Sequence, residues 1–383
     1  MQQGRSLMTR QAGRPPRKRE AVLEHLRQRI VGGELSPGAA LPSHHEIERR
    51  FQATPATVQE AMRILRAEGF VETRPRRGTF VVRHPPHLCN YALAFPWDPR
   101  RRGSQFYRAI CLEAARVKGI ARRISVFHNI ESHVDVEDYA RLASLVRAQR
   151  LAGIVFAARP FGLLEGTPLL DEPGMPRVVI ESRNLMDTAP TVYPDLPAFL
   201  PAALARLAAD GRRRVAVITA TAEESPEPPV EAFCELAAER GLLTRPHWLQ
   251  AVSVLVPAWG RQVARLLFAG ERGERPDALV VTDDNLVPAV TAGVTASGVR
   301  VPRDVEVVAH TNFPHPTPSA VPAIRLGYDI RSLVALCLER IDQQRRGERP
   351  PRRTLLPPLF ERELSDRPQC SAPQPQPTEG VRR

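Results

Sequence analysis

The feature that most constrains the fold is the segment 43–82, where two short helical patterns precede a basic hairpin pattern. Ser43 precedes Glu46 by three residues, a spacing typical of the capping box that begins a helix. Thr54 is predicted to cap a second helix, with Pro55 at its first position, where a missing N–H costs nothing. Two helices joined by about three or four residues predict a helix-turn-helix, whose second helix enters the major groove of DNA.

The second helix has one apolar face and is followed at once by a hairpin pattern. Its apolar residues recur at i, i+3, i+4 and i+7: Val58, Ala61, Met62 and Leu65. Gly69 is a suitable stop for this helix. The runs 70–73 and 79–82 are rich in strand-forming residues and flank a turn that contains three arginines. A capped helix pair with a basic hairpin is far more specific than a helix-turn-helix pattern alone.

Leu41-Pro42-Ser43 and the runs 57–62, 65–71 and 77–81 resemble the winged helix-turn-helix of the gluconate-repressor (GntR) family. The resemblance covers about residues 17–83. The family usually has arginines where this chain has His44, Pro55 and Gln59, so its usual operator sequence is not expected here. It also has glycine at the position of Arg76.

The resemblance and the helix-turn-helix pattern together predict which residues face DNA. The predicted DNA-binding residues are Ser43, His44, Thr54, Pro55, Thr57, Gln59, Arg63, Arg74, Arg76, Arg77, Gly78 and Thr79. The arginines are expected to neutralise phosphates, whereas Thr57 and Gln59 are better placed for base edges. Arg66 is left open between a DNA contact and a solvated position.

The distribution of charge favours DNA as the partner of this segment. The 383 residues carry a formal charge of +12, and residues 1–88 hold 16 Lys/Arg against 8 Asp/Glu. Five cysteines, an odd number with no C-x-x-C pair, favour neither a disulfide framework nor a zinc site. No signal peptide and no run of roughly 18 apolar residues is found, so a cytoplasmic protein without a membrane partner is expected.

Beyond residue 90 the pattern changes to apolar strand-like runs that alternate with helical segments, which predicts parallel sheets covered on both faces. The series occurs twice, with a division near residues 190–200, so two similar lobes are expected. The predicted fold class is α/β: an N-terminal winged helix-turn-helix (α+β) followed by a two-lobed domain with parallel sheets. The predicted domains are a disordered basic arm (1–16), the DNA-binding domain (17–83), a linker (84–90), the two-lobed domain (91–366) and a disordered tail (367–383).

The runs 210–218, 275–284 and 298–308 resemble the effector domain of lactose and galactose repressors (LacI/GalR), which is related to periplasmic binding proteins. The combination with a GntR-type reader resembles the architecture of bacterial arabinose repressors. This resemblance implies a small, sugar-like effector bound between the lobes and no cofactor.

Ligands of open α/β sheets bind beyond the carboxyl ends of the strands, where this chain offers polar side chains and one tryptophan. The predicted effector-binding residues are Trp97, Arg159, Glu181, Arg183, Asp195, Asp284 and Asn312. By the family resemblance, Glu181 and Arg183 fall on an acidic-x-Arg pattern, and Asp195 and Asp284 on family aspartates. The chain departs from the family at Pro229 and Thr311, so the sequence also allows an unusual effector.

The predicted function is a DNA-binding transcriptional repressor that binds a palindromic operator as a homodimer and responds to the effector. Repression is favoured over activation because occupying a promoter needs no further contacts. A constitutive regulator with a vestigial sensor is the first alternative. A fusion to an aminotransferase-like domain that binds pyridoxal phosphate is the second, but the only lysine beyond the DNA-binding segment is Lys118, beside Gly119 at a helix end. An enzyme is therefore not expected, nor is a metal site.

Overall fold

The computed structural model describes residues 18–99, 104–131, 137–158, 164–181, 189–221, 230–271 and 273–365. The predicted terminal arm and tail, together with Arg159 and Arg183, lie outside these ranges. Over the described helices, none is both long enough and apolar enough to cross a membrane.

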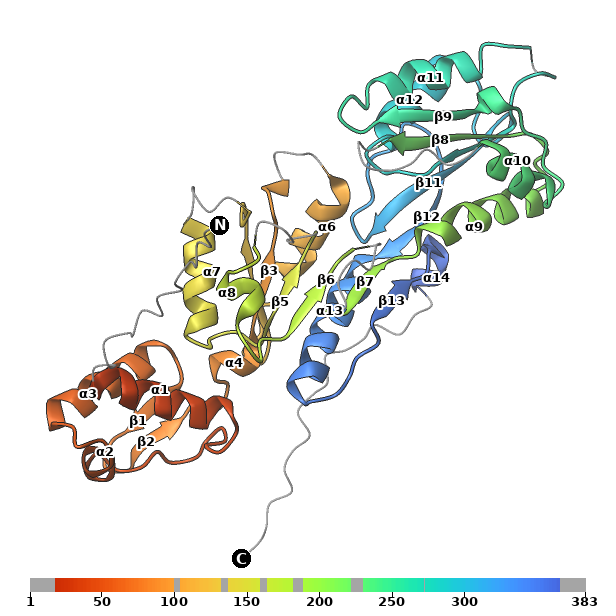
Figure 1. The fold of residues 1–383 in the computed structure, drawn as a ribbon. Coiled ribbons are helices and arrows are strands. Elements are labelled where there is room, and N and C mark those ends of the chain that lie inside the picture. Colours follow the sequence, from red (N-terminus) through yellow and green to blue (C-terminus); the bar gives the residue numbers. More distant parts are fainter. Residues whose placement is uncertain are drawn as a thin grey trace, which may run out of the picture. The chain divides into compact units, whose positions relative to one another are not determined.

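The N-terminal domain contains three helices and a two-stranded hairpin (Figure 1): α1 (Lys18–Val31), α2 (His44–Phe51), α3 (Pro55–Ala67), β1 (Val71–Arg74) and β2 (Gly78–Val81). The predicted apolar face of α3 is buried, and it packs with Val22, Leu26 and Ile30 of α1 in one small core. The hairpin closes that core through Val71 and Val81, which face each other across the strands. These elements confirm the predicted winged helix-turn-helix.

Two parallel sheets follow the short helix α4 (Pro86–Cys89), which occupies most of the predicted linker. The first has the order β13 (Arg353–Leu356), β7 (Thr191–Pro194), β6 (Arg177–Val179), β5 (Gly153–Phe156), β3 (Asn90–Ala94) and β4 (Arg123–Phe127). Helices α6 (Gln105–Ala114), α7 (Glu137–Arg147) and α8 (Pro168–Asp171) connect its strands.

The second sheet has the order β14 (Leu359–Phe360), β12 (Ile324–Asp329), β11 (Glu306–Phe313), β10 (Ala278–Val281), β8 (Val215–Thr221) and β9 (Leu249–Ser253). Only the short β14 is described as antiparallel to its neighbour. The helices of this part are α9 (Leu196–Ala209), α10 (Val230–Ala238), α11 (Trp259–Leu267), α12 (Val287–Ala296), α13 (Ile330–Arg345) and α14 (Glu361–Ser365), with one 3-10 turn, η1 (Pro246–Trp248). The predicted α/β class is confirmed.

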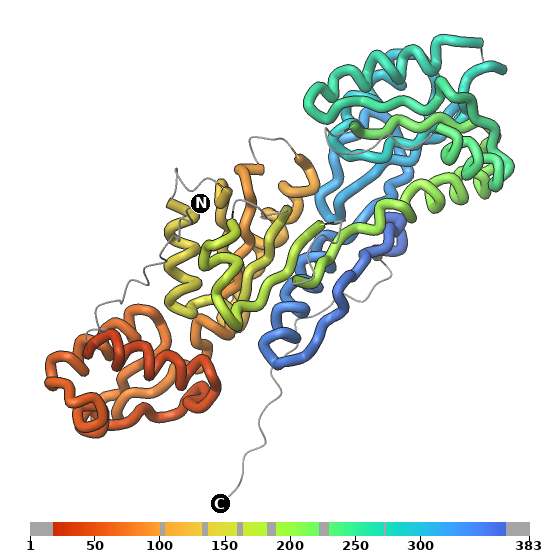
Figure 2. Tube along the Cα trace, viewed as in Figure 1, coloured from red at the N-terminus to blue at the C-terminus, as the bar shows by residue number. Residues whose placement is uncertain are grey.

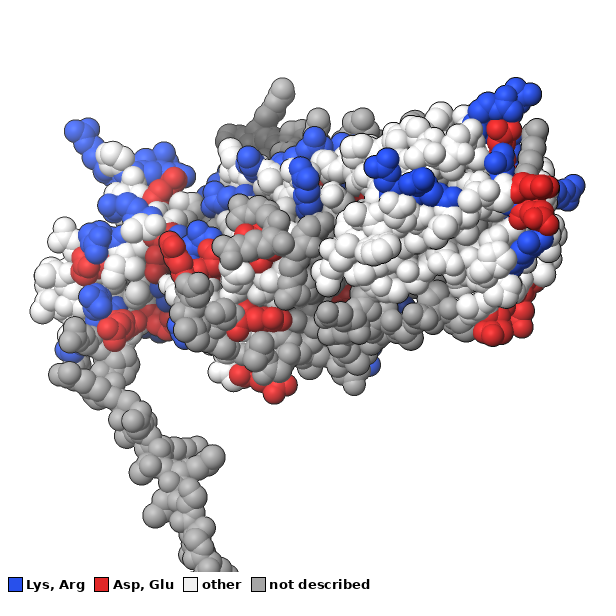
Figure 3. Space-filling model, turned by 90° about the horizontal axis from the view of Figure 1, so that it is seen from above, with Lys and Arg blue, Asp and Glu red and all other residues white. Residues whose placement is uncertain are grey.

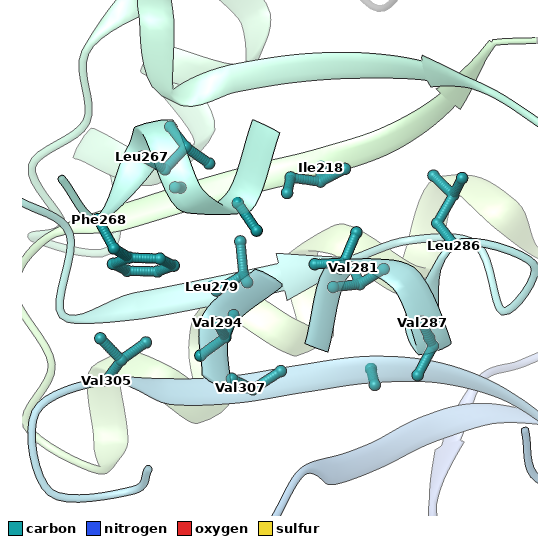
Figure 4. Packing of buried hydrophobic residues seen from close by; sticks show 14 of the residues in the cluster. Ile218, Leu267, Phe268, Leu279, Val281, Leu286, Val287, Val294, Val305 and Val307 are labelled. Atoms are coloured by element: carbon teal, nitrogen blue, oxygen red, sulfur yellow. The ribbon is translucent and has the colours of Figure 1, made fainter. Parts of the chain in front are cut away.

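Alternate residues of the second sheet face opposite layers of helices. Ile218, Leu279 and Val307 point toward α11 and α12 and form one apolar core with them (Figure 4). Helices α11 and α12 approach closely because Gly293 faces α11, where a Cβ atom would lie 2.4 Å from the Arg261 carbonyl oxygen. The strands are buried on both faces, which is why they read as continuous apolar runs.

The predicted division near residues 190–200 is only partly what the structure shows. Strand β7 completes the first sheet and β8 begins the second, but the late strand β13 returns to pair with β7 in parallel register (Figure 2). The chain accordingly divides into two compact units that interleave in sequence: unit 1 (1–97, 114–178, 340–350) and unit 2 (98–113, 179–339, 351–383).

Candidate DNA-binding surface and effector cluster

The two helix starts of the helix-turn-helix form as predicted. The Ser43 backbone N–H donates to Glu46 Oε2 at 2.7 Å, and the Glu46 N–H donates to Ser43 Oγ at 3.2 Å, which completes the capping box. The Thr57 N–H donates to Thr54 Oγ1 at 3.3 Å, with Pro55 in the first turn of α3. The hydroxyl groups of Thr54 and Thr57 also lie 2.8 Å apart. The Ser43 cap thus fixes the start of α2, and the Thr54 cap fixes the start of α3 after the turn.

An exposed polar face of α3 lies opposite its buried face. Gln59, Arg63 and Arg66 are exposed at positions i, i+4 and i+7, so they share one side of the helix. The Arg63 guanidinium is held by Glu60, with Nε 2.7 Å from Oε2. Arg66 donates to the Thr73 hydroxyl of β1, which joins this face to the hairpin. Among the described residues Gln59 has no hydrogen-bond partner, whereas Arg63 and Arg66 of the same face each have one.

The tip of the hairpin presents two arginines without acidic partners. Arg74 and Gly78 face each other across the strands, and residues 75–77 form the turn. Arg76 adopts a left-handed backbone with φ 60°. In the described part of the chain neither Arg76 nor Arg77 forms an ion pair, whereas Arg74 pairs with Glu72 at 2.7 Å and stacks over the Phe80 ring.

The space-filling view shows basic side chains projecting at the left end, where the DNA-binding domain lies, with acidic groups among them (Figure 3). Several arginines of this domain are already neutralised, such as Arg27 by Glu68 and Arg29 by Glu34. Within the described residues, Arg76 and Arg77 at the hairpin tip remain exposed without an ion pair, as do Arg49 and Arg50 of α2.

Unit 2 contains a buried polar cluster at the carboxyl ends of β10 and β11. These strands are parallel neighbours, so Asp284, just beyond β10, meets the end of β11. The Asn312 amide donates to Asp284 Oδ2 at 2.6 Å, and His310 Nδ1 lies 3.8 Å from Asp284 Oδ1, too far for a hydrogen bond. Asp284 is 2% exposed and Asn312 is fully buried.

Several polar atoms of this cluster are buried without a partner. Among the described residues, His310 Nδ1, Thr311 Oγ1 and Asn312 Oδ1 find no hydrogen-bond partner. Successive side chains of a strand point to opposite faces, so His310 and Asn312 share one face of β11 and Thr311 lies on the other. Because buried polar groups of folded proteins are nearly always satisfied, the two unpaired atoms on the shared face indicate a place where a polar ligand can bind. His310 Nδ1 and Asn312 Oδ1 are thus available for hydrogen bonds with a ligand.

Unit 2 also contains three tyrosines that interact with the cluster or with predicted effector residues: Tyr107, Tyr193 and Tyr328. The Tyr328 hydroxyl donates to the Asp195 carbonyl at 2.9 Å, and its ring lies 5.6 Å from the His310 ring. Burial, together with the charge of Glu181, raises the pKa of Tyr107 to about 12. Burial likewise raises the pKa of Tyr193, with smaller effects of Tyr107 and Glu181.

Of the predicted effector residues, the structure joins Asp284 and Asn312 by a hydrogen bond. Glu181, Asp195, Asp284 and Asn312 all belong to unit 2, whereas Trp97 belongs to unit 1. Sequence analysis did not single out Tyr107, Tyr193 or Tyr328. Of these three tyrosines, only Tyr193 could have been identified from the sequence, because it lies two residues before the predicted effector residue Asp195. In the described ranges, no three His, Cys, Asp or Glu side chains are arranged to hold a metal ion.

Asp283 is held in an electrostatically unfavourable position. Burial and the charge of Asp284 raise the pKa of Asp283, although its Oδ1 accepts from the Asn285 N–H and amide at 2.8 Å each. A raised folded-state pKa means that ionisation costs stability, and this cost is absent below about pH 4 and grows as the pH rises.

We therefore expect Asp283→Asn to raise the melting temperature at pH 7 and to have little effect near pH 3. The amide oxygen of asparagine can still accept both hydrogen bonds, so the change removes mainly the charge. Differential scanning calorimetry at both pH values measures this. An equal shift at pH 3 and pH 7 would contradict the electrostatic explanation.

Two family models match separate parts of the chain. Residues 18–81 match the family of bacterial regulatory proteins named gntR, and residues 204–363 match the periplasmic binding protein-like domain. The arabinose metabolism transcriptional repressor of Geobacillus stearothermophilus is 24% identical over 313 residues, which cover 76% of this chain and 81% of that protein.

Two solved structures have the fold of the region after the DNA-binding domain. A LacI family regulator from Bifidobacterium animalis subsp. lactis has a TM-score of 0.52 at 17% identity, over 72% of this chain and 96% of its own. A LacI family regulator from Lactobacillus casei with bound sucrose has a TM-score of 0.51 at 16% identity, over 71% and 98%. The chain has the architecture of a transcriptional regulator, in which a DNA-binding domain that matches the gntR family precedes a periplasmic-binding-protein-like domain.

Proposed function

We propose that the protein is a repressor whose operator binding is controlled by a sugar-like effector bound at the polar cluster of unit 2. The observation that carries this proposal is the group of orphan buried atoms around Asp284 and Asn312, because sugar hydroxyl groups both donate and accept hydrogen bonds. The relative from Geobacillus stearothermophilus, a repressor of arabinose metabolism, supports a sugar as the effector class.

On the DNA side, α3 would contact base edges and the hairpin would contact phosphates. Gln59 would read base edges, because its side chain is exposed and unpaired on the polar face of α3. Thr57 would contribute less through its hydroxyl, which already faces Thr54. The remaining predicted contacts would go to phosphates: Ser43, His44, Thr54, Pro55, Arg63, Arg74, Arg76, Arg77, Gly78 and Thr79.

On the effector side, the carboxylate of Asp284 would accept from one hydroxyl group, and Asn312 and His310 would bind a neighbouring one. Glu181 and Asp195 would complete the polar rim. Tyr107 and Tyr193 offer ring faces of the kind on which sugar rings stack. Trp97, Arg159 and Arg183 remain predicted contributors to effector binding.

A regulator that reads two half-sites has to self-associate, and unit 2 carries a suitable apolar stripe. On α11, Trp259 is 62% exposed and Leu266 is 76% exposed, seven residues apart and hence on one face. Leu255, just before the helix, is 69% exposed. Exposed apolar patches of this kind mark interaction sites, and we propose that this stripe forms the homodimer interface.

We expect the double substitution Trp259→Glu and Leu266→Glu to convert the dimer to a monomer and to weaken operator binding. Like charges placed on a two-fold interface face each other and repel, whereas Arg261→Glu on the polar face of α11 serves as the matched control. Sedimentation velocity gives the oligomeric state. A dimer that persists in the double variant would exclude this interface.

The two alternative functions assign a different role to the polar cluster of unit 2. A constitutive regulator with a vestigial sensor would bind the operator equally with and without sugars. An enzyme that uses pyridoxal phosphate would need a buried lysine, but Lys118 is exposed and belongs to unit 1. We propose a regulator without enzymatic activity that acts in the cytoplasm, where its DNA is found.

The proposed function is tested in two steps. The purified protein selects its operator from a random DNA library, and it is then screened by thermal shift against L-arabinose, other pentoses, hexoses and sugar phosphates. A ligand at 100 times its Kd stabilises the folded state by about 2.7 kcal/mol. A sugar that stabilises the protein and changes its operator affinity supports the proposal, and stable operator binding that no sugar changes favours the constitutive alternative.

A further inference from the structure

Helix α13 has its first residues in the polar cluster of unit 2. It begins at Ile330, directly after Tyr328 and Asp329 at the end of β12. Asp329 Oδ1 accepts from the Arg331 N–H at 3.1 Å, and its Oδ2 accepts from the Ser332 hydroxyl at 2.6 Å. The Tyr328 ring lies beside His310, so the start of α13 is tied to the proposed effector site.

The other end of the same helix lies in unit 1. The helix passes from unit 2 to unit 1 between Glu339 and Arg340. Its 16 residues correspond to about 24 Å at 1.5 Å per residue. Near its end, the Ile341 side chain fits against Gly153 of β5, where a Cβ atom would lie 2.6 Å from Ile341 Cγ2. This close contact leaves the helix little room to move without affecting its neighbours.

The last turn of α13 carries an ionic network around the buried carboxylate of Asp342. The Tyr91 hydroxyl donates to Asp342 Oδ1 at 2.6 Å, and Arg122 Nη2 lies 2.5 Å from Asp342 Oδ2. Arg345 Nη1 donates to Asp342 Oδ1 at 3.0 Å and to the Leu88 carbonyl oxygen at 3.2 Å. Arg345 therefore connects α13 to α4, the short helix that follows the DNA-binding domain.

Helix α4 in turn packs against the DNA-binding domain. The His87 ring stacks on Phe70, with centroids 5.9 Å apart and planes 21° apart. Phe70 is fully buried and belongs to the same core as Leu65 of α3. Burial, with a smaller effect of Arg345, lowers the pKa of His87 to about 4, so the stacked ring is neutral at physiological pH.

From these contacts we infer that α13 is the element that couples the effector site to the DNA-binding domain, through Arg345, α4 and the stacking of His87 on Phe70. The inference rests on the proposed function and adds how the effector signal reaches α3. A shift of α13 at Asp329 moves Arg345, which pulls the Leu88 carbonyl and tilts α4. Because His87 packs on the core behind α3, the tilt changes how α3 is presented to DNA. Arg345 is a positioning residue and touches neither ligand.

The test uses the full-length protein and needs no effector. Asp329→Ala perturbs α13 at the effector end, and Arg345→Ala breaks the connection at the other end. Arg346→Ala is the matched control, because this neighbouring arginine pairs with Glu348, beyond the end of α13. Ser332→Ala replaces Asp329→Ala if the latter does not fold, since it removes a single hydrogen bond.

Hydrogen exchange measured by mass spectrometry gives the first readout. We expect residues 86–90 to exchange at least about tenfold faster in Arg345→Ala and in Asp329→Ala, and at the wild-type rate in Arg346→Ala. Equal exchange in all four proteins would overturn the inference. This readout does not depend on DNA or on any sugar, so it remains decisive even if the proposed function fails.

A double-mutant cycle on DNA affinity gives the second readout, with the duplex that the wild-type protein selects. We expect Asp329→Ala to change the affinity at least about threefold when Arg345 is present and less than about 1.5-fold in the Arg345→Ala background. Independent effects that simply multiply would show that the signal does not pass through Arg345. Failure of the wild-type protein to select any duplex would instead contradict the proposed function.

Discussion

Replacing both Arg76 and Arg77 by alanine is expected to weaken binding to every DNA sequence by a similar factor. Each phosphate contact contributes about 0.9 to the slope of log K against log salt, so two lost contacts lower the slope by about 1.8. At 0.1 M salt this corresponds to an affinity loss on the order of 60-fold. The effect is large because these two arginines form no ion pair within the described chain.

The measurement is a salt titration of fluorescence anisotropy with the selected duplex and with a random duplex. Arg265→Ala combined with Arg303→Ala is the matched control, since it removes the same charge from exposed positions of unit 2. Gln59→Ala provides the contrasting case, in which affinity for the selected duplex falls and affinity for random DNA does not. A salt slope that is unchanged in the Arg76 and Arg77 variant would exclude the hairpin from the DNA interface.

The second large effect concerns Asp284, which we expect to be required for sugar binding. A charged hydrogen bond contributes about 1.5–3 kcal/mol, so loss of the bond from the sugar hydroxyl to Asp284 weakens binding by about 10- to 150-fold. Asp284→Asn keeps the shape of the side chain and an oxygen that accepts from the Asn312 amide. The protein should therefore fold normally while it loses the thermal shift that the best sugar of the panel produces.

Isothermal titration calorimetry with that sugar measures the loss. Asp210→Asn is the control, because this carboxylate at the end of α9 pairs with Arg206 and lies away from the strand ends. Operator binding without sugar should be unchanged in both variants. Wild-type sugar affinity in Asp284→Asn would show that the effector binds elsewhere, and loss of operator binding would show that the change disturbs the fold.

The DNA-binding domain was predictable because its signals are local. Ser43 with Glu46, and Thr54 with Pro55, mark helix starts within one turn of sequence, and the structure forms both caps. The hairpin was equally local, since residues 70–82 contain both strands and the turn. Arg76 has a positive φ of 60°, a conformation that glycine adopts easily. The glycine that the family has at this position indicated it, whereas an arginine does not.

The later strands were harder to read. Strand β12 was not expected, because Gly327 at its centre weakens the strand pattern, yet the structure needs glycine there. A Cβ atom at Gly327 would lie 1.7 Å from the Thr311 carbonyl oxygen of β11. Helix α13 and strand β13 were also missed, and both connect parts of the chain that are distant in sequence.

The sequence by itself determined the class of domain at each end of the chain and the residue types at the strand ends. Those properties follow from caps, turns and apolar runs, which act over a few residues. Only the tertiary structure decided that Asn312 meets Asp284, that β13 joins β7, and that α13 links the polar cluster to α4. These are contacts between parallel strands and across helix crossovers, and no local pattern fixes which distant residues the crossovers bring together.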